Sequence, residues 1–321
     1  MRERVIFMFS GQGSQYFQMG RELFEHNAVF RSQVQRLDRI GVQLLGTSLV
    51  DYLYDRSRHK WEPFEAILFS NAALFTIQYA LAQAVVEDGV VPDILLGSSL
   101  GTFVATAVGG CFSAEDGLRA VIHLARIVEE RCPAGGMLAI LAHPDLYRQD
   151  RFLQSHSELA GVNFDAHFVL AGSPANLQKI ATLMRERNIS CQAIAVPRAF
   201  HSRLIDAAEE PCREMFRSLP RRRSCVPITC TAQVALLEAI SEHSLWRAVR
   251  DPMRLRDTIE LLERTGDANL YLDVGPSGTL AAFVKYHLTG AARSRATAVL
   301  TPFGRDVHSY RHAMSHVRAA D

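Results

Sequence analysis

Ile94-Leu95-Leu96-Gly97-Ser98-Ser99-Leu100-Gly101-Thr102-Phe103-Val104 is the stretch that decides how this chain of 321 residues folds. Residues 94–96 are a short apolar run typical of a buried strand, and residues 100–108 have the length and composition of a buried helix. The five residues 97–101 between them carry two glycines, which is typical of a tight turn. Residues 94–112 contain no charge and match a membrane span in length, but glycines and hydroxyls interrupt the bulk that such a span has. We therefore predict a buried strand, a turn and a buried helix.

The chain before this stretch reads as alternating buried strand and helices. Val5–Phe9 is predicted to be a buried strand that ends in the polar loop Ser10-Gly11-Gln12-Gly13-Ser14-Gln15. Ser113 and Asp116 form a capping box for the helix after the decisive stretch. One helix is expected to end near Phe24. Further helices are expected within 27–54, 72–86 and 115–131.

The middle of the chain has a different rhythm. A break at 133–136 is followed by an expected strand, helix, one or two strands, helix and strand, at 137–141, 144–156, 162–171, 173–187 and 191–196. This order is the ferredoxin-like pattern. Ser173 followed by Pro174 is typical of the cap and first position of a helix. Beyond Pro197 we expect helices near 202–217 and 254–264, a strand at 270–274 and a terminal helix within 304–321.

The composition is that of an ordinary globular protein, and its net charge is close to zero. Apolar residues make up 48% of the chain, charged residues 21%, and the net charge is +1. Nothing global therefore points to nucleic acid. The six cysteines form no CxxC pair and no Cys/His ligand spacing, so we expect inert thiols in a reducing cytoplasm and no metal site. The N-terminus lacks the apolar region of a signal peptide. We expect a cytoplasmic monomer that binds neither nucleic acid nor membranes.

Gly97-x-Ser99-x-Gly101 matches the nucleophile elbow, in which a serine sits on a strained turn between a strand and a helix. The two glycines are needed because a side chain there would collide with the neighbouring strand and helix. The helix N-terminus favours negative charge beside Ser99, and the N–H of Leu100 is a candidate oxyanion donor. The fold class is therefore α/β: a large α/β-hydrolase-like domain (1–132 and 198–321) with an inserted small ferredoxin-like subdomain (133–197).

A serine nucleophile needs a base and a second oxyanion donor. Among twelve histidines, His201 in Ala199-Phe200-His201 is the best candidate, because the chain returns there to the large domain. On spacing alone an ordinary surface histidine is the alternative. Gln12, in a glycine-flanked loop at a strand end, is a candidate for the second donor.

Four motifs taken together resemble one family. They are Ser10-Gly11-Gln12-Gly13-Ser14-Gln15, Gly97-x-Ser99-x-Gly101, Ala199-Phe200-His201 and Asp273-Val274-Gly275-Pro276. In this order they resemble the malonyl-CoA:acyl-carrier-protein transacylases, which include the acyltransferase domains of polyketide synthases. Asn163 and the segment 246–254 fit the same pattern, and the resemblance covers nearly the whole chain.

The resemblance implies a mechanism and a set of partners. Ser99 would be the nucleophile, His201 the base, and Gln12 with the Leu100 amide the oxyanion hole. A backbone carbonyl near residues 274–276 would orient His201. The acyl group would arrive as a thioester, on coenzyme A or on the 4′-phosphopantetheine of an acyl carrier protein domain of a polyketide synthase, and would form an ester with Ser99. No cofactor is implied.

The sequence departs from this family in its acyl pocket. Leu124 stands where malonyl-loading members carry the arginine that pairs with the malonyl carboxylate, and Arg126 could replace it only with a two-residue shift. Ser98 stands in place of a histidine, and Asn71 in place of a glutamine; both are smaller and would make the pocket wetter. Phe200 goes with malonyl units in the family and would disfavour α-branched acyl groups. We expect the acyl pocket to be formed by Leu124, Phe200, Ser98, Asn163 and Asn71.

With these departures, the sequence resembles the discrete acyl hydrolases that accompany polyketide synthases lacking built-in acyltransferases. The leading hypothesis is an acyl-carrier-protein hydrolase that removes uncharged groups such as acetyl. The alternatives are a trans-acting acyltransferase, for malonyl or another unit, and a non-catalytic module derived from the family. Carrier proteins are acidic, so Arg198 and the triplet Arg221, Arg222 and Arg223 are candidate docking residues. A solvated loop is the other interpretation of the triplet.

Overall fold

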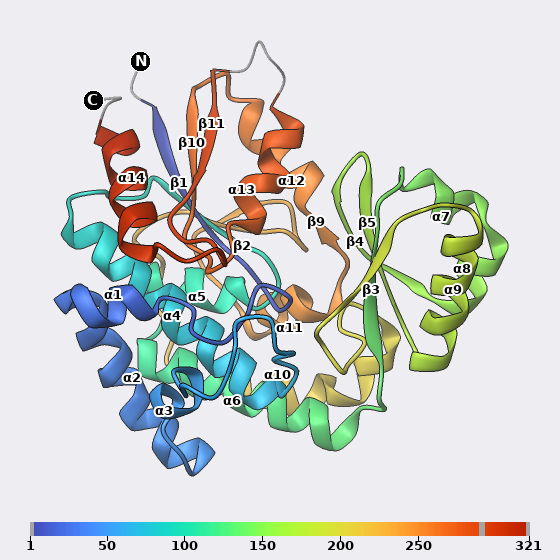
Figure 1. Cartoon of the computed structure of the whole chain (residues 1–321), viewed down its shortest axis with the longest axis horizontal. Helices are drawn as coiled ribbons and strands as arrows, with labels where there is room; N and C mark the ends of the chain where they lie inside the picture. The colour runs from blue at the N-terminus through green and yellow to red at the C-terminus, as the bar shows by residue number, and fades with distance from the viewer. Residues whose placement is uncertain (1–2, 289–292, 319–321) are drawn as a thin grey trace.

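The larger of two sheets forms the centre of the molecule and is parallel over five of its six strands (Figure 1). A computed structural model of the chain describes residues 3–288 and 293–318. The strand order is β11-β10-β1-β2-β7-β8. In chain order these strands are β1 (Arg4–Phe9), β2 (Ile94–Gly97), β7 (Ile228–Cys230), β8 (Leu236–Leu237), β10 (Asn269–Asp273) and β11 (Arg295–Ala298). Only β8 pairs antiparallel, at one edge.

Alternate residues of the central strands face two separate hydrophobic layers. Phe7 and Phe9 of β1 pack into the main core, whereas Ile6 and Met8 pack against helices on the other face. Both faces of the sheet are therefore covered, which explains the continuous apolar runs of β1 and β2. The helices of the main core include α2 (Ala28–Leu45), α4 (Ile67–Glu87), α5 (Gly101–Val108), α6 (Ala114–Arg131), α10 (Glu209–Arg217) and α11 (Glu242–Arg250). Those on the opposite face are α12 (Leu255–Glu263) and α13 (Thr279–His287).

Several predicted elements are confirmed with shifted bounds. Ser113 caps α6, and its hydroxyl accepts from the Asp116 N–H at 3.0 Å. The remaining helices of the larger part are α1 (Arg21–His26), α3 (Leu49–Leu53), the 3-10 helix η1 (Arg203–Ala208) and α14 (Asp306–Arg318). The predicted terminal helix extended to residue 321, and residues 319–321 lie outside the described part. Among the described residues one helix, α4, is long and apolar enough to cross a membrane. Of its apolar 18-residue segment, 78% is buried inside the structure.

The second sheet has the predicted ferredoxin-like order and lies to the right in Figure 1. Its elements are β3 (Gly136–Ile140), α7 (Asp145–Gln149), α8 (Arg151–His156), β4 (Glu158–Phe164), β5 (His167–Gly172), α9 (Pro174–Glu186) and β6 (Cys191–Ile194). The single helix expected at 144–156 divides at Asp150, which caps α8. The expected strand region 162–171 is a two-stranded hairpin. A fifth strand, β9 (Met253–Arg254), joins β4 from beyond residue 197 and so links the two parts.

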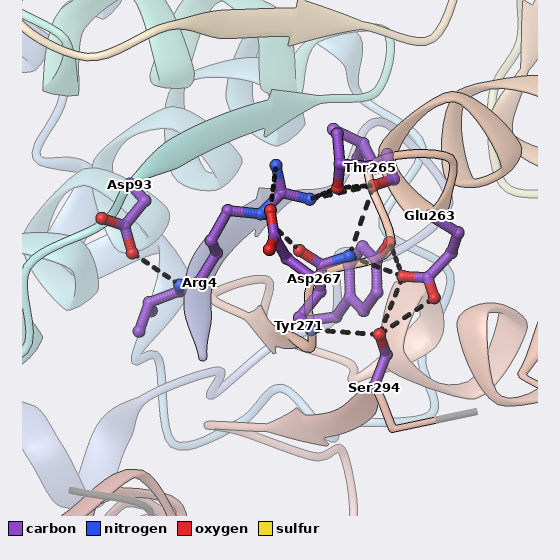
Figure 2. A network of polar contacts seen from close by, with 10 residues as sticks. Arg4, Asp93, Glu263, Thr265, Asp267, Tyr271 and Ser294 are labelled. Carbon is purple, nitrogen blue, oxygen red and sulfur yellow. Dashed lines mark hydrogen bonds and ion pairs between the residues drawn. The ribbon is translucent and has the colours of Figure 1, made fainter. Parts of the chain in front are cut away.

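A polar network fastens the amino ends of the central strands (Figure 2). Arg4 donates to Leu262 O and to Thr265 Oγ1, and lies 3.9 Å from an Asp267 carboxylate oxygen. Tyr271 donates to the Glu263 carboxylate at 2.7 Å. This network joins β1 and β10 to the end of α12. It leaves the carboxyl ends of the strands, where β2 turns into α5, free to form a site.

The elbow glycines pack directly against backbone. A Cβ built on Gly97 would lie 2.4 Å from Thr102 Cα of α5, and one on Gly101 would lie 2.0 Å from Phe9 O of β1. The predicted collision with helix and strand is therefore confirmed at both positions. The turn can form only where these two positions lack side chains.

Substituting Gly101→Ala is expected to lower the free energy of unfolding by about 3 kcal/mol or more, because β1 must move to admit the methyl group. Gly41→Ala, within helix α2, is the matched control, since a Cβ there would make an ordinary 3.7 Å contact with Leu49 of helix α3. The control should leave stability unchanged or raised. Urea unfolding of both variants checks this. Equal stability of the two variants would contradict the close packing of the elbow.

Candidate active site

Ser99 occupies the turn between β2 and α5 in a left-handed backbone conformation, with φ 53°. Such a conformation is rare for a residue with a side chain and is found where the surrounding structure enforces it, often at functional sites. The N–H groups of Gly101 and Thr102 donate to Ser98 O and Ser99 O. The N–H of Leu100 donates to no other group in the described part of the chain. It is therefore free to bind a developing oxyanion beside Ser99.

His201 lies against Ser99, as expected of a serine and its base. Ser99 Oγ and His201 Nε2 are 2.9 Å apart, and His201 Nδ1 lies 2.7 Å from Asp251 O. A carbonyl can only accept, so Nδ1 carries the proton and Nε2 accepts from the serine hydroxyl. His201 also has a left-handed backbone, with φ 61°, and its N–H donates to Val249 O.

The carbonyl that orients His201 was predicted in the wrong segment. It belongs to Asp251, directly after α11, and not to the loop 274–276. That loop is held elsewhere: Val274 N–H donates to Met8 O, and Gly275 N–H donates to the Asp273 carboxylate. Asp251 lies within the segment 246–254, which the sequence singled out without a role.

Burial keeps His201 neutral. The side chain is fully enclosed, and removal from water lowers the pKa of His201 to about 4, although the Asp251 carbonyl partly opposes this shift. At neutral pH the imidazole is therefore a free base that can take the Ser99 proton.

Gln12 is held by Asn71. Its Nε2 donates to Asn71 Oδ1 at 2.5 Å, and Asn71 Nδ2 donates to Val121 O of α6 at 3.2 Å. The second Nε2 proton of Gln12 is left for a ligand in the cavity. Asn71 itself is buried and is not among the residues that line the cavity, so its assignment to the acyl pocket was wrong. The shorter asparagine binds Gln12 and does not reach the cavity wall.

A cavity of about 340 Å³ opens beside Ser99 and His201, between the two sheets. Ser98, Asn163 and Phe200, three of the residues expected to form the acyl pocket, line it. The other described lining residues are Ser10, Gly11, Gln12, Gly13, Ser14, Met137, Ala139, His167, Val169, Gln192, Ala193, Ile194, Ala195, Met253, Thr279, Leu280 and Phe283. No lysine, arginine, aspartate or glutamate lines it among the described residues. The only described lining residues that could carry a charge near neutral pH are His167 and His201. Burial lowers the pKa of both, which favours their neutral forms.

Leu124 does not line this cavity. It is fully buried in the main core on α6, one turn beyond Val121, so its assignment to the acyl pocket was wrong. An apolar side chain at this position packs into the core. Arg126 does not replace the missing arginine either, because its guanidinium donates to Leu44 O at the end of α2.

Sequence reasoning missed several residues of the cavity. His167 accepts at Nδ1 from Asn163 Nδ2 at 3.0 Å, so its Nε2 carries a proton. Met253 lies 3.6 Å from Ser98 Oγ. Phe283 contacts the His167 ring, at 4.9 Å between centroids. His167 and Phe283 come from segments without a motif, and Met253 comes from the segment 246–254, which was singled out without a role. Only the fold brings the three together.

The arginines predicted to dock a carrier protein do not cluster at the cavity. Arg222 N–H donates to Cys111 O beyond the end of α5, and α5 leads away from Ser99 over about 12 Å. Arg221 pairs with Glu242 at 3.1 Å, and Arg223 pairs with Glu238. Arg198 donates to the backbone carbonyls of Pro197 and Glu129. The triplet is therefore remote from the elbow and largely engaged within the chain.

In the described part of the chain, neither the cysteines nor any group of metal-ligating side chains forms a second candidate site. All six cysteines are free, and only Cys225 is exposed. Among the described residues no group of three or more histidine, cysteine or acidic side chains could hold a metal ion.

Comparison with known proteins gives a consistent result. The family model "Acyl transferase domain" matches residues 6–320. The polyketide biosynthesis acyltransferase homolog PksD of Bacillus subtilis (strain 168) is 42% identical over 307 residues, which are 96% of this chain and 94% of that protein. The polyketide biosynthesis protein ThaF of Burkholderia thailandensis is 37% identical over 305 residues, covering 94% of this chain and 26% of ThaF.

Solved structures share the fold. The acyltransferase domain from the second module of the salinomycin polyketide synthase superimposes with a TM-score of 0.86 at 26% identity, over 100% of this chain and 75% of that one. FabD from Acinetobacter baumannii superimposes with a TM-score of 0.84 at 22% identity, over the whole of both chains.

Labelling of Ser99 by a fluorophosphonate is expected to be independent of pH between about 5.5 and about 8. The neutral imidazole is the reactive form, and it is lost only as pH falls through the pKa of His201, which burial lowers to about 4. Labelling rates followed by mass spectrometry check this, with Ser99→Ala as the unlabelled control. A rate that halves near pH 6.5 would contradict the effect of burial, and absence of labelling would favour a non-catalytic role.

Gln12→Ala is expected to slow the acylation of Ser99 about 10²-fold, because one oxyanion donor is lost. Asn71→Ala should slow it about tenfold, since Gln12 is then free to rotate. The double variant should be no slower than Gln12→Ala alone, because Asn71 acts through Gln12. Single-turnover acylation by an acetyl thioester checks this. Additive losses would contradict the positioning role of Asn71.

Proposed function

The chain belongs to the acyl transferase domain family, and from this premise we propose that it is an acyl hydrolase that removes uncharged acyl groups, such as acetyl, from acyl carrier proteins of a polyketide synthase. Membership of the family makes it an acyl-transferring enzyme. The observation that carries the finer proposal is the uncharged lining of the cavity at the Ser99–His201 pair, in the described part of the chain.

The first half-reaction loads Ser99. Oγ attacks the thioester carbonyl while His201 Nε2, at 2.9 Å, takes its proton. The Leu100 N–H and the free Gln12 N–H bind the oxyanion. The tetrahedral intermediate collapses, the C–S bond breaks, and the proton on His201 passes to the leaving thiolate. The products are acyl-Ser99 and the free pantetheine thiol.

The second half-reaction decides between hydrolase and transferase. In the hydrolase, His201 takes a proton from water as the water oxygen attacks the ester carbonyl, and returns it to Ser99 Oγ as the free acid leaves. A transferase must keep water off its acyl-enzyme. Here Ser98 presents a small hydroxyl to the cavity next to Ser99, with Thr231 Oγ1 at 3.4 Å. This polar corner beside the nucleophile supports capture of the acyl group by water.

The acyl group is proposed to be uncharged and without an α-branch. A malonyl carboxylate would enter a wall that offers no cation among the described residues, and an unpaired buried carboxylate costs several kcal/mol. Phe200, which is almost fully buried at the wall, limits the width available to branched groups. The protein supplies no cofactor in this scheme; the pantetheine arm is part of the substrate.

The second candidate is a trans-acting acyltransferase in polyketide biosynthesis. The name of the family and of the 42% identical Bacillus relative favour it. It uses the same acyl-Ser99 and differs only in the acceptor, which would be a second carrier thiol or coenzyme A.

With acetyl-loaded and malonyl-loaded carrier protein, we expect kcat/KM for acetyl to exceed that for malonyl at least about a hundredfold. Free acetate should form faster than acetyl transfers to a second carrier protein or to coenzyme A. Mass spectrometry of the carrier proteins together with measurement of released acid checks both expectations. Ser99→Ala is the inactive control.

Faster transfer than release would replace the hydrolase with the transferase. Equal rates for acetyl and malonyl would contradict the argument from the uncharged wall.

A further inference from the structure

A basic, aromatic surface lies beside the cavity and takes no part in the chemistry described above. We propose that it is the surface on which an acidic carrier protein docks, an inference that rests on the proposed function. We call it the basic aromatic surface, and it consists of Arg56, Arg58, Lys60, Trp61, Phe303 and Arg305.

The two aromatic side chains are unusually exposed. Phe303 is 92% exposed and Trp61 80%, the two highest values for large apolar side chains in the described part of the chain. Trp61 stacks on His59, with ring centroids 4.8 Å apart, and does not pack into the core. A single exposed apolar residue is ordinary, but exposed aromatic side chains among arginines are typical of the centre of a protein interface.

In the part of the chain that the structure describes, two of the four cations of this surface are free to meet a partner, whereas Lys60 acts electrostatically on Asp306 in the same hollow. Arg56 and Arg305 have no acidic partner within the described ranges, and Lys60 lies over the Tyr16 ring, 5.8 Å from its centroid. Arg58 pairs with Glu62 at 3.2 Å on the exposed surface, a contact of little strength. The surface therefore attracts an acidic protein.

Two segments form one continuous surface. Arg56, Arg58 and Lys60 line a shared hollow together with Asp306, which follows Arg305. Lys60 Nζ lies 3.5 Å from the point where a Cβ on Gly304 would stand. The acidic residues on the floor of the hollow are engaged there: Asp306 accepts from Glu22 N–H, and Glu22 accepts from Val307 N–H.

The loop after β1, whose residues 10–14 line the cavity, lies between the segment that carries Trp61 and the segment that carries Phe303. Gln15 Nε2 donates to Phe64 O, just after Trp61, and to Ala195 O, which belongs to the cavity wall. The single proton of Tyr16 OH is shared between Pro276 O at 2.9 Å and Thr301 O at 3.2 Å. A protein seated on Trp61 and Phe303 would thus stand beside the cavity that its tethered thioester must enter.

Position favours a carrier protein over other acidic partners. A nucleic acid or an anionic membrane would also be attracted to cations and aromatic rings, but neither needs to be next to the Ser99 cavity. The net charge of +1 also provides no wider basic field for such partners. The Arg221–Arg223 triplet lies at the far end of α5 and supplies a matched comparison on the same molecule.

The test uses Arg56→Glu/Arg58→Glu/Lys60→Glu, with Arg222→Glu/Arg223→Glu as the control. The measured step is acetylation of Ser99, followed by mass spectrometry, from acetyl-carrier protein and from the small acetyl-N-acetylcysteamine thioester. We expect the KM for acetyl-carrier protein to rise about tenfold or more in the first variant, with kcat and the rate with the small thioester unchanged. The control variant should match the native protein. Trp61→Ala should raise the same KM and spare the small thioester.

An unchanged KM in the triple variant, or an equal rise in the control, would overturn the proposal. So would binding of a single-stranded oligonucleotide or of phosphatidylserine vesicles that is lost in the triple variant while the KM for carrier protein stays the same. Because acetylation of Ser99 precedes the choice of acceptor, failure of hydrolysis would leave this measurement intact. If no carrier protein acylates Ser99, the proposed function fails; carrier affinity measured by calorimetry then still tests the surface, and equal affinities of the native protein and the triple variant would overturn it.

Discussion

The structure depends on one close contact, the approach of the elbow to the central strand. Gly101 lies so near Phe9 O that a Cβ would stand 2.0 Å from it, and a Cβ on Gly11 would stand 2.8 Å from Ser99 Cβ. This contact fixes α5 on β1 and holds Ser99 in a left-handed backbone. It also places the end of β1, with Gln12, directly beside the nucleophile. The oxyanion site is therefore a consequence of how the first two strands pack, because the loop that carries Gln12 begins where β1 ends.

Removal from water determines the chemistry of His201. A serine–histidine pair is often completed by a carboxylate, which orients the imidazole and stabilises its charged form. Here a backbone carbonyl orients the ring, and a carbonyl stabilises the charged form far less than an anion does. Burial then prevails and keeps the base neutral, with its pKa lowered to about 4. The left-handed backbone at both Ser99 and His201 shows that the fold, more than a third side chain, sets their geometry.

The sequence predicted well those features that have a local cause. The elbow, the capped helix α6 and the ferredoxin-like order follow from glycine positions, caps and periodicity within short windows. β7, β9 and β11 are only two to four residues long and were not predicted, because they lack the run of large aliphatic side chains that identified the equally short β2. The carbonyl of Asp251 could not be predicted either, because every residue has a carbonyl and only tertiary packing selects one. Leu124 shows the same limit: the family resemblance singled out its position on α6, but the side chain's direction depends on packing against the core.

The distribution of charge differs between the cavity, which receives the acyl group, and the outer surface, on which the carrier is proposed to dock. In the described part of the chain, the cavity wall carries no cation that could select a charged acyl group, whereas four cations gather outside on the basic aromatic surface. A cation in the cavity would bind the acyl group and would favour malonyl units. A cation on the outer surface acts on the carrier and is indifferent to what that carrier bears. An enzyme that removes unwanted acyl groups needs the second arrangement, because it must meet loaded carriers in general and discriminate against the carboxylate that extension requires. The uncharged cavity wall in the described part of the chain and the presence of Arg56 and Lys60 outside are consistent with that single requirement.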